Sequence, residues 1–385
     1  MFLNKKIEIT IFVVDDTRFE QLGNLDEYTS LMWPDAFNGY AQFQLHAPIT
    51  ENNSGLIKEG NVIWCGGENA AVIEIIKADV DEEGNRSYEV KGRTLEKYLA
   101  RRIVWGTYSS GKAYASTIMY DMVDKNAINP INVDRKIPYL VNAEDKQIGL
   151  KLDQYQKTGG ELYEALYNLA TDSDIGFSII FDPRNKRLVF EVRMGVDRTQ
   201  NNTEGNDPVV FSSDLEDILS SSYYMNAEDV KNVAFVQGED SGENRKSVVA
   251  GDNTKIGFER KELYVDARDL QSEIEVEKGG DTEQVVLTEE EYNAILTQRG
   301  NEKLSENVKT ETFESKIRQF GDIQYQFGVD YEKGDKITVV DWELGISVSA
   351  RITNVEEDFS DEYSLVLTFG YSFPTLLRRV KRIIG

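Results

Sequence analysis

The stretch Tyr331–Gly370, YEKGDKITVVDWELGISVSARITNVEEDFSDEYSLVLTFG, decides the fold of this chain. Gly334 and Asp335 form a turn, and three segments follow that are β-branched or alternate apolar and polar residues: Lys336–Val340, Ile346–Val355 and Tyr363–Phe369. Turn residues separate the three segments. Alternation with a period of two between turns is typical of β-strands. We therefore predict an antiparallel three-stranded meander.

An earlier stretch, Glu59–Gly92, nearly repeats this pattern, with a Gly-Gly turn and then an acidic turn between its segments. The matched positions are Gly60 and Gly334, Ile63 and Ile337, Val80 and Val355, and Tyr88 and Tyr363. A short basic element follows each copy, at Leu99–Ile103 and at Leu377–Val380. β meanders also resemble one another by chance, which leaves an accidental likeness open. A true internal repeat would give two copies of one β module.

Charge limits the partners of this chain. Its 385 residues carry 43 Lys and Arg against 68 Asp and Glu, a net charge of −25. Such a surface repels nucleic-acid phosphates at long range and disfavours ordinary DNA recognition, but it is compatible with a pore through which DNA slides. The apolar fraction of 40% argues against global disorder.

Cys65 and His46 are the single cysteine and the single histidine. A disulfide within one chain and a cysteine-rich zinc site are therefore excluded. The N-terminus lacks the apolar core of a signal peptide, and no window approaches the run of roughly 18 apolar residues that spans a bilayer. We expect a soluble protein made in the cytoplasm, with no cofactor, no metal and no stable membrane anchor.

Along the chain, the predicted secondary structure changes twice, from strands to mixed helices and strands and back to strands. The first part predicts strands at Ile7–Val14, Tyr28–Trp33 and Tyr40–Ala47, a turn at Pro34–Gly39 and, after the first meander, a short helix at Thr94–Arg102. The middle predicts helices at Ala113–Lys125 and Glu161–Thr171, the second with a capping box from Thr158 to Glu161, and a hairpin of Phe177–Phe181 with Arg187–Val192.

Strands return after Ile218. We predict them at Leu219–Tyr224, Asn232–Gln237, Phe258–Val265 and Val308–Ile317, with a mobile hairpin tip at Asp240–Asn253, an exposed acidic excursion at Asp266–Glu291 and a helix opened by a capping box from Thr288 to Glu291. The predicted domains are a first β domain at 1–105, an α/β insert at 106–215, a second β domain at 216–372 with an excursion at 266–307, and a tail at 373–385.

Several residue groups could carry chemistry, and each has a plainer structural interpretation. His46 and Cys65 could form a thiol–imidazole pair, but a cysteine at the end of an apolar strand is ordinarily a small buried hydrophobe. Asp79–Gly84 begins like a calcium loop, yet Val90 stands where the last carboxylate ligand belongs. Acidic pairs that could serve a glycosidase are expected everywhere among 68 acids: Glu356 and Glu357, and Asp214, Glu216 and Asp217. We predict no catalytic residue.

The end of the chain, Phe373–Gly385, predicts a basic amphipathic helix on an acidic protein. It could dock on an acidic groove of a neighbouring chain, pack on its own subunit or lie on a membrane surface. The candidate partner-binding residues are Leu376, Leu377, Arg378, Arg379, Val380, Lys381, Arg382 and Ile383.

Five stretches in order resemble the tail hub proteins of long-tailed bacteriophages, which are related to baseplate hub proteins and to the N-terminal region of tail-associated lysins. These stretches are Gly92–Ile103, Asn232–Gly238, Gly257–Glu262, Tyr331–Ile337 and Ala350–Val355. The resemblance implies an α+β, mostly β fold with two tail-tube-like antiparallel β-barrel domains and an inserted small α/β domain. Some relatives carry a C-terminal peptidase or lysozyme extension; because about fifteen residues follow the last meander, we expect none here.

The resemblance also implies a function and partners. Three subunits with two barrels each would form a homotrimeric, pseudo-hexameric ring at the tail tip of the virion. That ring would join the sixfold tail tube or distal tail protein to a threefold central spike or fibre protein. Genome DNA would pass through an acidic lumen without specific binding. The alternatives are a tail enzyme that degrades peptidoglycan or carbohydrate, and a receptor-binding tail protein.

Overall fold

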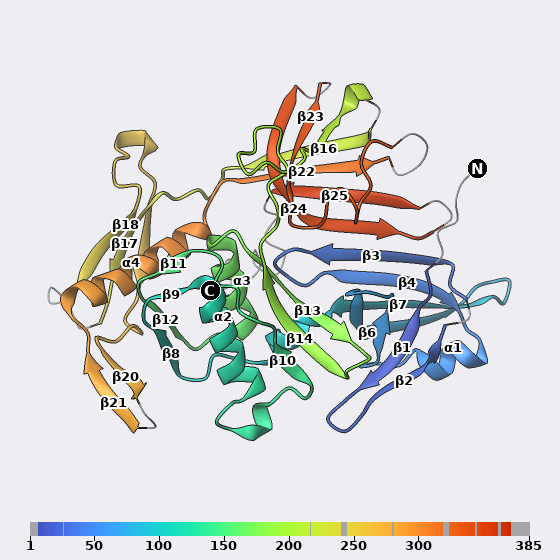
Figure 1. Cartoon of the computed structure of the whole chain (residues 1–385), viewed down its shortest axis with the longest axis horizontal. Helices are drawn as coiled ribbons and strands as arrows, with labels where there is room; N and C mark the ends of the chain where they lie inside the picture. Colours follow the sequence, from blue (N-terminus) through green and yellow to red (C-terminus); the bar gives the residue numbers. More distant parts are fainter. Residues whose placement is uncertain are drawn as a thin grey trace.

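A computed structural model of the chain describes residues 7–25, 27–215, 217–239, 245–278, 281–318, 323–342, 345–360 and 363–370. Its dominant feature is a largely antiparallel sheet of 13 strands that runs across the right-hand side of the molecule in Figure 1. Two further regions pack to the left of this sheet or against its lower part. The architecture is mostly β, as the sequence predicts.

The sheet contains two groups of strands. The first group is β1 (Thr10–Val14), β2 (Phe19–Asn24), β3 (Ser30–Ala36), β4 (Gln42–Pro48), β5 (Val62–Trp64), β6 (Ala70–Val80) and β7 (Arg86–Thr94), with the short helix α1 (Glu51–Leu56). The second group is β15 (Val210–Ser212), β16 (Ile218–Asn226), β22 (Thr310–Ile317), β23 (Lys336–Asp341), β24 (Ile346–Asp358) and β25 (Ser364–Gly370).

The two groups repeat the same strand order. The first reads β3-β4-β7-β6-β5-β1 and the second reads β16-β22-β25-β24-β23-β15. They differ at the last step, because β1 pairs antiparallel with β5 whereas β15 pairs parallel with β23. Both predicted meanders are thus confirmed, and each lies at the same place in its own module. We call these two groups the N-module and the C-module.

Backbone hydrogen bonds fix the equivalent residues. Gly60 N donates to Ile73 O at 2.9 Å, and Gly334 N donates to Ile352 O at 3.0 Å. Both glycines have positive φ, +82° and +92°. The predicted match of Gly60 with Gly334 is therefore confirmed, and Ile63 with Ile337 follows from the same register.

The other two predicted matches are wrong. A bulge follows Ile73 in β6 and Ile352 in β24, so the strand register continues from these residues. On that register Val355 is equivalent to Ile76 rather than to Val80, and Tyr88 is equivalent to Leu365 rather than to Tyr363. The hairpin between the first and second strands is longer in the C-module, where Ile352 follows Ile337 by 15 residues, than in the N-module, where Ile73 follows Ile63 by 10. A match that keeps one spacing is therefore out of register in the second and third strands.

Among the described residues the sheet is open, so they form no closed barrel, whereas the family resemblance implies two. Its outermost strands in the continuous path are β16 and β2. The C-terminal half of β24 pairs with β25 of its own module on one side and with β3 of the N-module on the other. Pro34–Gly39, predicted as a turn, supplies Pro34–Ala36 to β3 because these residues pair with β24.

A second region packs on the inner face of β1 and β5. It consists of the 3-10 helix η1 (Leu95–Arg101), the π-helical turn η2 (Asp124–Ile128), the 3-10 turn η3 (Val133–Arg135), the helices α2 (Ala115–Val123) and α3 (Leu162–Asp172), and the strands β8 (Thr107–Ser110), β9 (Ala113–Tyr114), β10 (Leu140–Asn142), β11 (Lys151–Leu152), β12 (Tyr155–Thr158), β13 (Gly176–Asp182) and β14 (Arg187–Arg193). Phe12 of β1 and Phe19 of β2 belong to the core of this region, where both rings contact Phe181.

A third region has a core of its own. It consists of β17 (Val233–Gln237), β18 (Ser247–Gly251), β19 (Glu262–Asp266), β20 (Glu273–Lys278), β21 (Asp281–Val286) and the helix α4 (Glu289–Ser305), with the 3-10 turn η6 (Gly257–Glu259) before β19. The 3-10 turn η4 (Ser213–Leu215) lies between β15 and β16 of the C-module. Asp240–Asn253, predicted as a hairpin tip, contributes strand β18, because Val248 and Ala250 turn toward this core.

The two predicted capping boxes have different outcomes. Thr288 Oγ1 accepts from Glu291 N at 3.3 Å and Glu291 Oε2 accepts from Thr288 N at 2.8 Å, which confirms the cap of α4. The cap from Thr158 to Glu161 is wrong. Thr158 ends β12 opposite Thr107, and α3 begins only at Leu162 with Glu161 as its N-cap.

The equivalent glycines give a matched test of the joint between modules. An added Cβ at Gly60 meets nothing within 4 Å, whereas one at Gly334 would lie 2.3 Å from the Phe37 ring. We expect Gly60→Ala to destabilise the chain by about 1 kcal/mol through left-handed strain alone. Gly334→Ala should cost roughly 1–3 kcal/mol more, because it adds a clash. Equal losses in urea unfolding would contradict the contact.

Glu96 predicts a pH dependence of stability. Its side chain is 6% exposed and its Oε1 accepts from Ile179 N at 2.8 Å. Burial raises the pKa of this carboxyl. The stabilising contribution of the neutral acid is therefore complete below the unfolded pKa and is lost as pH rises through the folded pKa. Glu96→Gln should keep the acceptor and flatten this loss. Parallel pH–stability curves for the variant and the parent chain would contradict this account.

Candidate assembly surfaces

The two β modules join through strand pairing. The N-terminal half of β24 pairs with β23 of its own module, and its C-terminal half pairs antiparallel with β3. The register of this joint runs from Asn354 opposite Ala36 to Asp358 opposite Met32. Phe37 N then donates to Thr353 O at 2.9 Å and extends the pairing. Backbone hydrogen bonds thus make one sheet of two modules.

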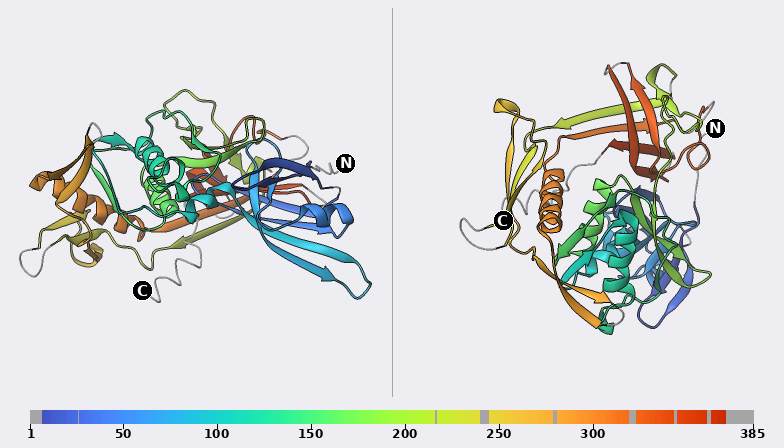
Figure 2. Two further views of the ribbon diagram at one scale, coloured as in Figure 1. Left: turned by 90° about the horizontal axis from the view of Figure 1, so that it is seen from below. Right: turned by 60° about the vertical axis from the view of Figure 1, so that its left-hand side comes forward.

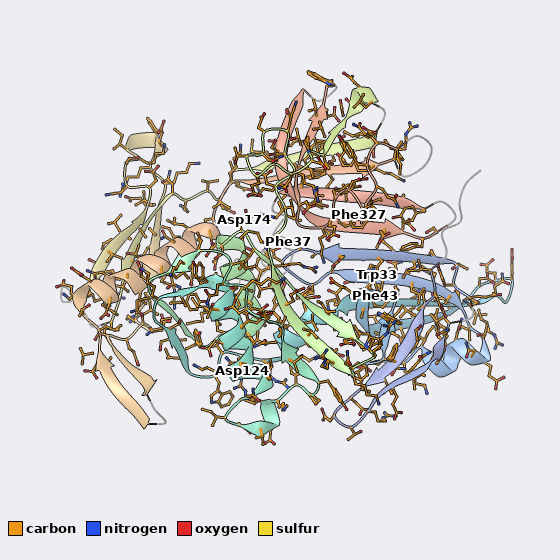
Figure 3. The ribbon with its side chains drawn as sticks, in the orientation of Figure 1. Trp33, Phe37, Phe43, Asp124, Asp174 and Phe327 are labelled. Atoms are coloured by element: carbon orange, nitrogen blue, oxygen red, sulfur yellow. The ribbon has the colours of Figure 1, made fainter. Side chains whose placement is uncertain are left out.

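Phe37 lies where both modules meet the second region, beside Asp174 (Figure 3). Arg351 of β24 places its guanidinium 5.0 Å from the centre of the Phe37 ring. The same guanidinium donates to Asp174 through Nε at 2.8 Å and through Nη2 at 2.6 Å, and its Nη1 donates to Gly334 O. Arg351, which is 9% exposed, therefore contacts the N-module, the C-module and the second region at once.

Asp174 is held by two cations. Lys336 Nζ lies 2.7 Å from its Oδ2, on the same carboxylate that Arg351 binds. Burial acts to raise the pKa of Asp174, but the hydrogen bonds and charges of Arg351 and Lys336 prevail and lower it. The carboxylate therefore remains ionised, and the bidentate arginine fixes its orientation as well as its charge.

The β24–β25 turn completes the joint. Phe359 N donates to Leu31 O at 2.8 Å, and Phe359 and Tyr363 are members of the N-module core. Lys333 Nζ also lies 2.5 Å from Asp35 Oδ2. The C-module thus inserts two aromatic side chains into the core of its neighbour.

Two strand segments remain exposed outside this joint. The outer half of β6 carries Ile75, Ile76 and Val80, and the hairpin that it forms with β7 extends beyond the body of the molecule (Figure 2, left). β16 carries Leu219, Tyr223, Tyr224 and Met225 at exposed positions. Each segment has one strand neighbour in the described part of the chain, β7 and β22 respectively. Exposed apolar strand edges are typical of surfaces that pair with another chain.

Sequence reasoning missed both exposed segments. Ile75 and Ile76 are neighbours in a strand, so their side chains point to opposite faces and a single buried face cannot cover both. This pair was the sequence signal for an exposed apolar segment. The predicted partner-binding residues, from Leu376 to Ile383, lie outside the described residues. The first basic element, at Leu99–Ile103, is described: it ends η1, where Arg101 lies 4.7 Å from the centre of the Tyr98 ring.

The residue groups weighed for chemistry have structural partners. His46 Nε2 lies 2.8 Å from Gln44 Nε2, while Cys65 packs on the N-module core and burial raises its thiol pKa. Asp81 accepts hydrogen bonds from Asn85 and Glu83 within its turn.

Of the acidic groups, Glu357 accepts from Tyr363 Oη at 2.6 Å. Asp214 and Asp217 flank Glu216, which is not among the described residues. Those residues hold no cluster of three or more His, Cys, Asp or Glu that could bind a metal ion. None of their helices has both the length and the apolar character needed to cross a membrane.

Comparisons with known proteins agree over nearly the whole chain. The family model described as Siphovirus ReqiPepy6 Gp37-like protein matches residues 8–371. The 43 kDa tail protein of prophage MuSo2 from Shewanella oneidensis is 13% identical, with a TM-score of 0.55 over 94% of this chain and 98% of that one. A tail protein from Neisseria meningitidis MC58 is 14% identical, with a TM-score of 0.53 over 95% and 96%.

A third solved structure, prophage tail protein gp18 from Listeria monocytogenes EGD-e, is 11% identical, with a TM-score of 0.51 over 98% of both chains. At these identities the likeness concerns the fold. No curated protein sequence matches the chain.

The arginine at the joint predicts a measurable loss of stability. Arg351→Met should destabilise the chain by about 2 kcal/mol, because Asp174 then keeps only Lys336 as a charged donor and Gly334 O loses the donor that Arg351 supplies. The control is Arg18→Met, which removes an exposed ion pair with Asp15 and should cost clearly less than Arg351→Met, because exposed ion pairs contribute little to stability. Denaturant unfolding checks both variants. Equal small effects would contradict the role of Arg351.

Proposed function

The chain belongs to the Siphovirus ReqiPepy6 Gp37-like protein family, and from this we propose that it is a structural protein of a phage tail. We propose further that it is the tail-tip hub: a homotrimeric ring that joins a sixfold tail tube or distal tail protein to a threefold spike or fibre. In this role it acts by assembly and not by catalysis. Its site of action is the tail tip of the virion.

The observation that carries the proposal is the repeat of one strand order in a single chain. Three copies of a chain with two equivalent modules present six similar modules, which suits contact with a sixfold ring on one side. The regions outside the repeat are present once per chain, so they suit a threefold partner on the other side. Closed rings of identical contacts are the common form of homo-oligomers.

Charge supports the channel in this proposal. The chain carries a net charge of −25, and acidic walls repel phosphates. DNA can therefore pass a lumen of this kind without binding to it. The basic residues of the tail, Arg378 to Arg382, are then available to attach the spike or fibre protein.

Native mass tests the ring. A concentration series by light scattering or native mass spectrometry should show a species of three times the 43.8 kDa chain mass. If the purified chain is monomeric, adding the adjacent tail proteins should produce three copies per complex. A chain that stays monomeric in their presence, or that assembles in another number, contradicts the proposed ring.

A further inference from the structure

The joint between the two modules uses a surface that each module carries. Within the chain, the outer half of β24 in the C-module pairs with β3 in the N-module. The equivalent of β24 in the N-module is β6, and the equivalent of β3 in the C-module is β16. Each module therefore has a strand of each kind, β24 and β16 in the C-module and β6 and β3 in the N-module. Within the described part of one chain, only β24 and β3 pair with each other.

We propose that the unused halves pair with one another between copies: residues 75–79 of β6 in one copy with residues 222–226 of β16 in the next. This rests on the proposed ring and deepens it, because it names the strands that close the ring. The occupant of each exposed edge is a second copy of this chain. The contact repeats the internal β24–β3 joint.

The register follows from hydrogen-bonded neighbours. Ile73 lies opposite Gly92, which lies opposite Phe43, and in the C-module Ile352 lies opposite Phe369, which lies opposite Phe313. Phe43 and Phe313 are therefore equivalent, and both are buried. One residue further, Gln44 pairs with Met32 of β3 and Glu314 pairs with Ser222 of β16. Met32 and Ser222 are thus equivalent.

The internal register then transfers residue by residue. It places Asn354 to Asp358 opposite Ala36 to Met32, with the strands antiparallel. The proposed pairs between copies are Ile75 with Asn226, Ile76 with Met225, Lys77 with Tyr224, Ala78 with Tyr223, and Asp79 with Ser222.

Burial at the internal joint shows what the exposed edges would gain. Trp33 is 2% exposed, and its equivalent Tyr223 is 42% exposed. Val355 is 2% exposed, and its equivalent Ile76 is 37% exposed. The apolar character of both positions is kept, and both are more exposed than their equivalents at the internal joint.

At the tip of the β6–β7 hairpin, too, an apolar residue is more exposed than its equivalent at the internal joint. Phe359, whose amide donates to Leu31 O at 2.8 Å, is 5% exposed at the internal joint. The register makes Val80 its equivalent, and Val80 is 65% exposed at the tip of the β6–β7 hairpin. In the proposed contact Val80 N donates to Ser221 O of the neighbouring copy, and the Val80 side chain enters the C-module of that copy.

The contact is directional, because β6 of one copy meets β16 of another and the two surfaces differ. Such a head-to-tail contact leaves one β6 edge and one β16 edge exposed at the ends of any open assembly. It is completed when the copies close into a ring. Alternation of internal and intermolecular joints then gives every module the same two neighbours.

Disulfide trapping tests the pairing. In a Cys65→Ala background, Ala78→Cys and Tyr223→Cys place the thiols on directly opposed residues. Opposed Cα atoms lie about 4.5–5.5 Å apart in an antiparallel ladder, within the range of a disulfide. We expect a reducible covalent ladder that ends at the closed ring on a non-reducing gel. The control, Ala78→Cys with Leu219→Cys, shifts one thiol by about 13 Å along β16 and should cross-link at least ~10-fold less.

A charge exchange tests the same register without cysteines. Ile76→Lys and Met225→Glu should each reduce the assembled fraction measured by native mass, and the double variant should restore it. Both side chains are exposed in the single chain, so its fold should tolerate the changes. Phe258→Glu, at a fully exposed apolar residue of η6 away from both edges, should leave assembly unchanged.

The outcomes separate the two proposals. A trimer that forms without the 78–223 disulfide overturns the strand pairing and leaves the ring. An assembly of another size that forms the disulfide supports the pairing and overturns the trimer. A chain that stays monomeric with its tail partners, and without the disulfide, overturns both.

Discussion

The structure depends on the antiparallel pairing of β24 with β3. β24 is long enough to serve two modules: its first half pairs with β23, and its second half pairs with β25 of the C-module on one side and with β3 of the N-module on the other. Because the shared element is a ladder of backbone hydrogen bonds, the two modules cannot slide without breaking the sheet. The aromatic turn with Phe359 and Tyr363 then closes the joint from the side.

Around that ladder a single polar cluster sets the position of the second region. Arg351 stacks on Phe37, binds Asp174 and reaches a carbonyl of the turn at Gly334. Each of these partners comes from a different part of the chain, and the positive φ of Gly334 brings its backbone against the Phe37 ring. Guanidinium geometry suits this task, since a planar group can stack and donate to several acceptors at once.

The chain therefore has two kinds of strand edge, one covered within the chain and one exposed. The edge formed by β24 and β3 is covered, charged at its rim and filled by aromatic residues. The equivalent edge formed by β6 and β16 keeps apolar side chains in an exposed position. A protein that acts alone ordinarily blocks such edges with proline, bulges or inward charges. The family relationship and the repeated strand order both make assembly the simplest reason for their retention.

Much of this was open to prediction from residues alone, and the remainder has a common physical cause. Alternation and turn residues identified both meanders, and Thr288 with Glu291 identified the cap of α4, because these signals are local. The match of Gly60 with Gly334 could be found because a left-handed turn requires a particular residue. Tertiary pairing decided the rest: Pro34 entered a strand to meet β24, Thr158 entered β12 instead of capping a helix, and Val355 aligned with Ile76 across a bulge. β24 and β3 are separated by more than 300 residues in the sequence, so which edges are covered and which are left exposed is a property of the assembled sheet.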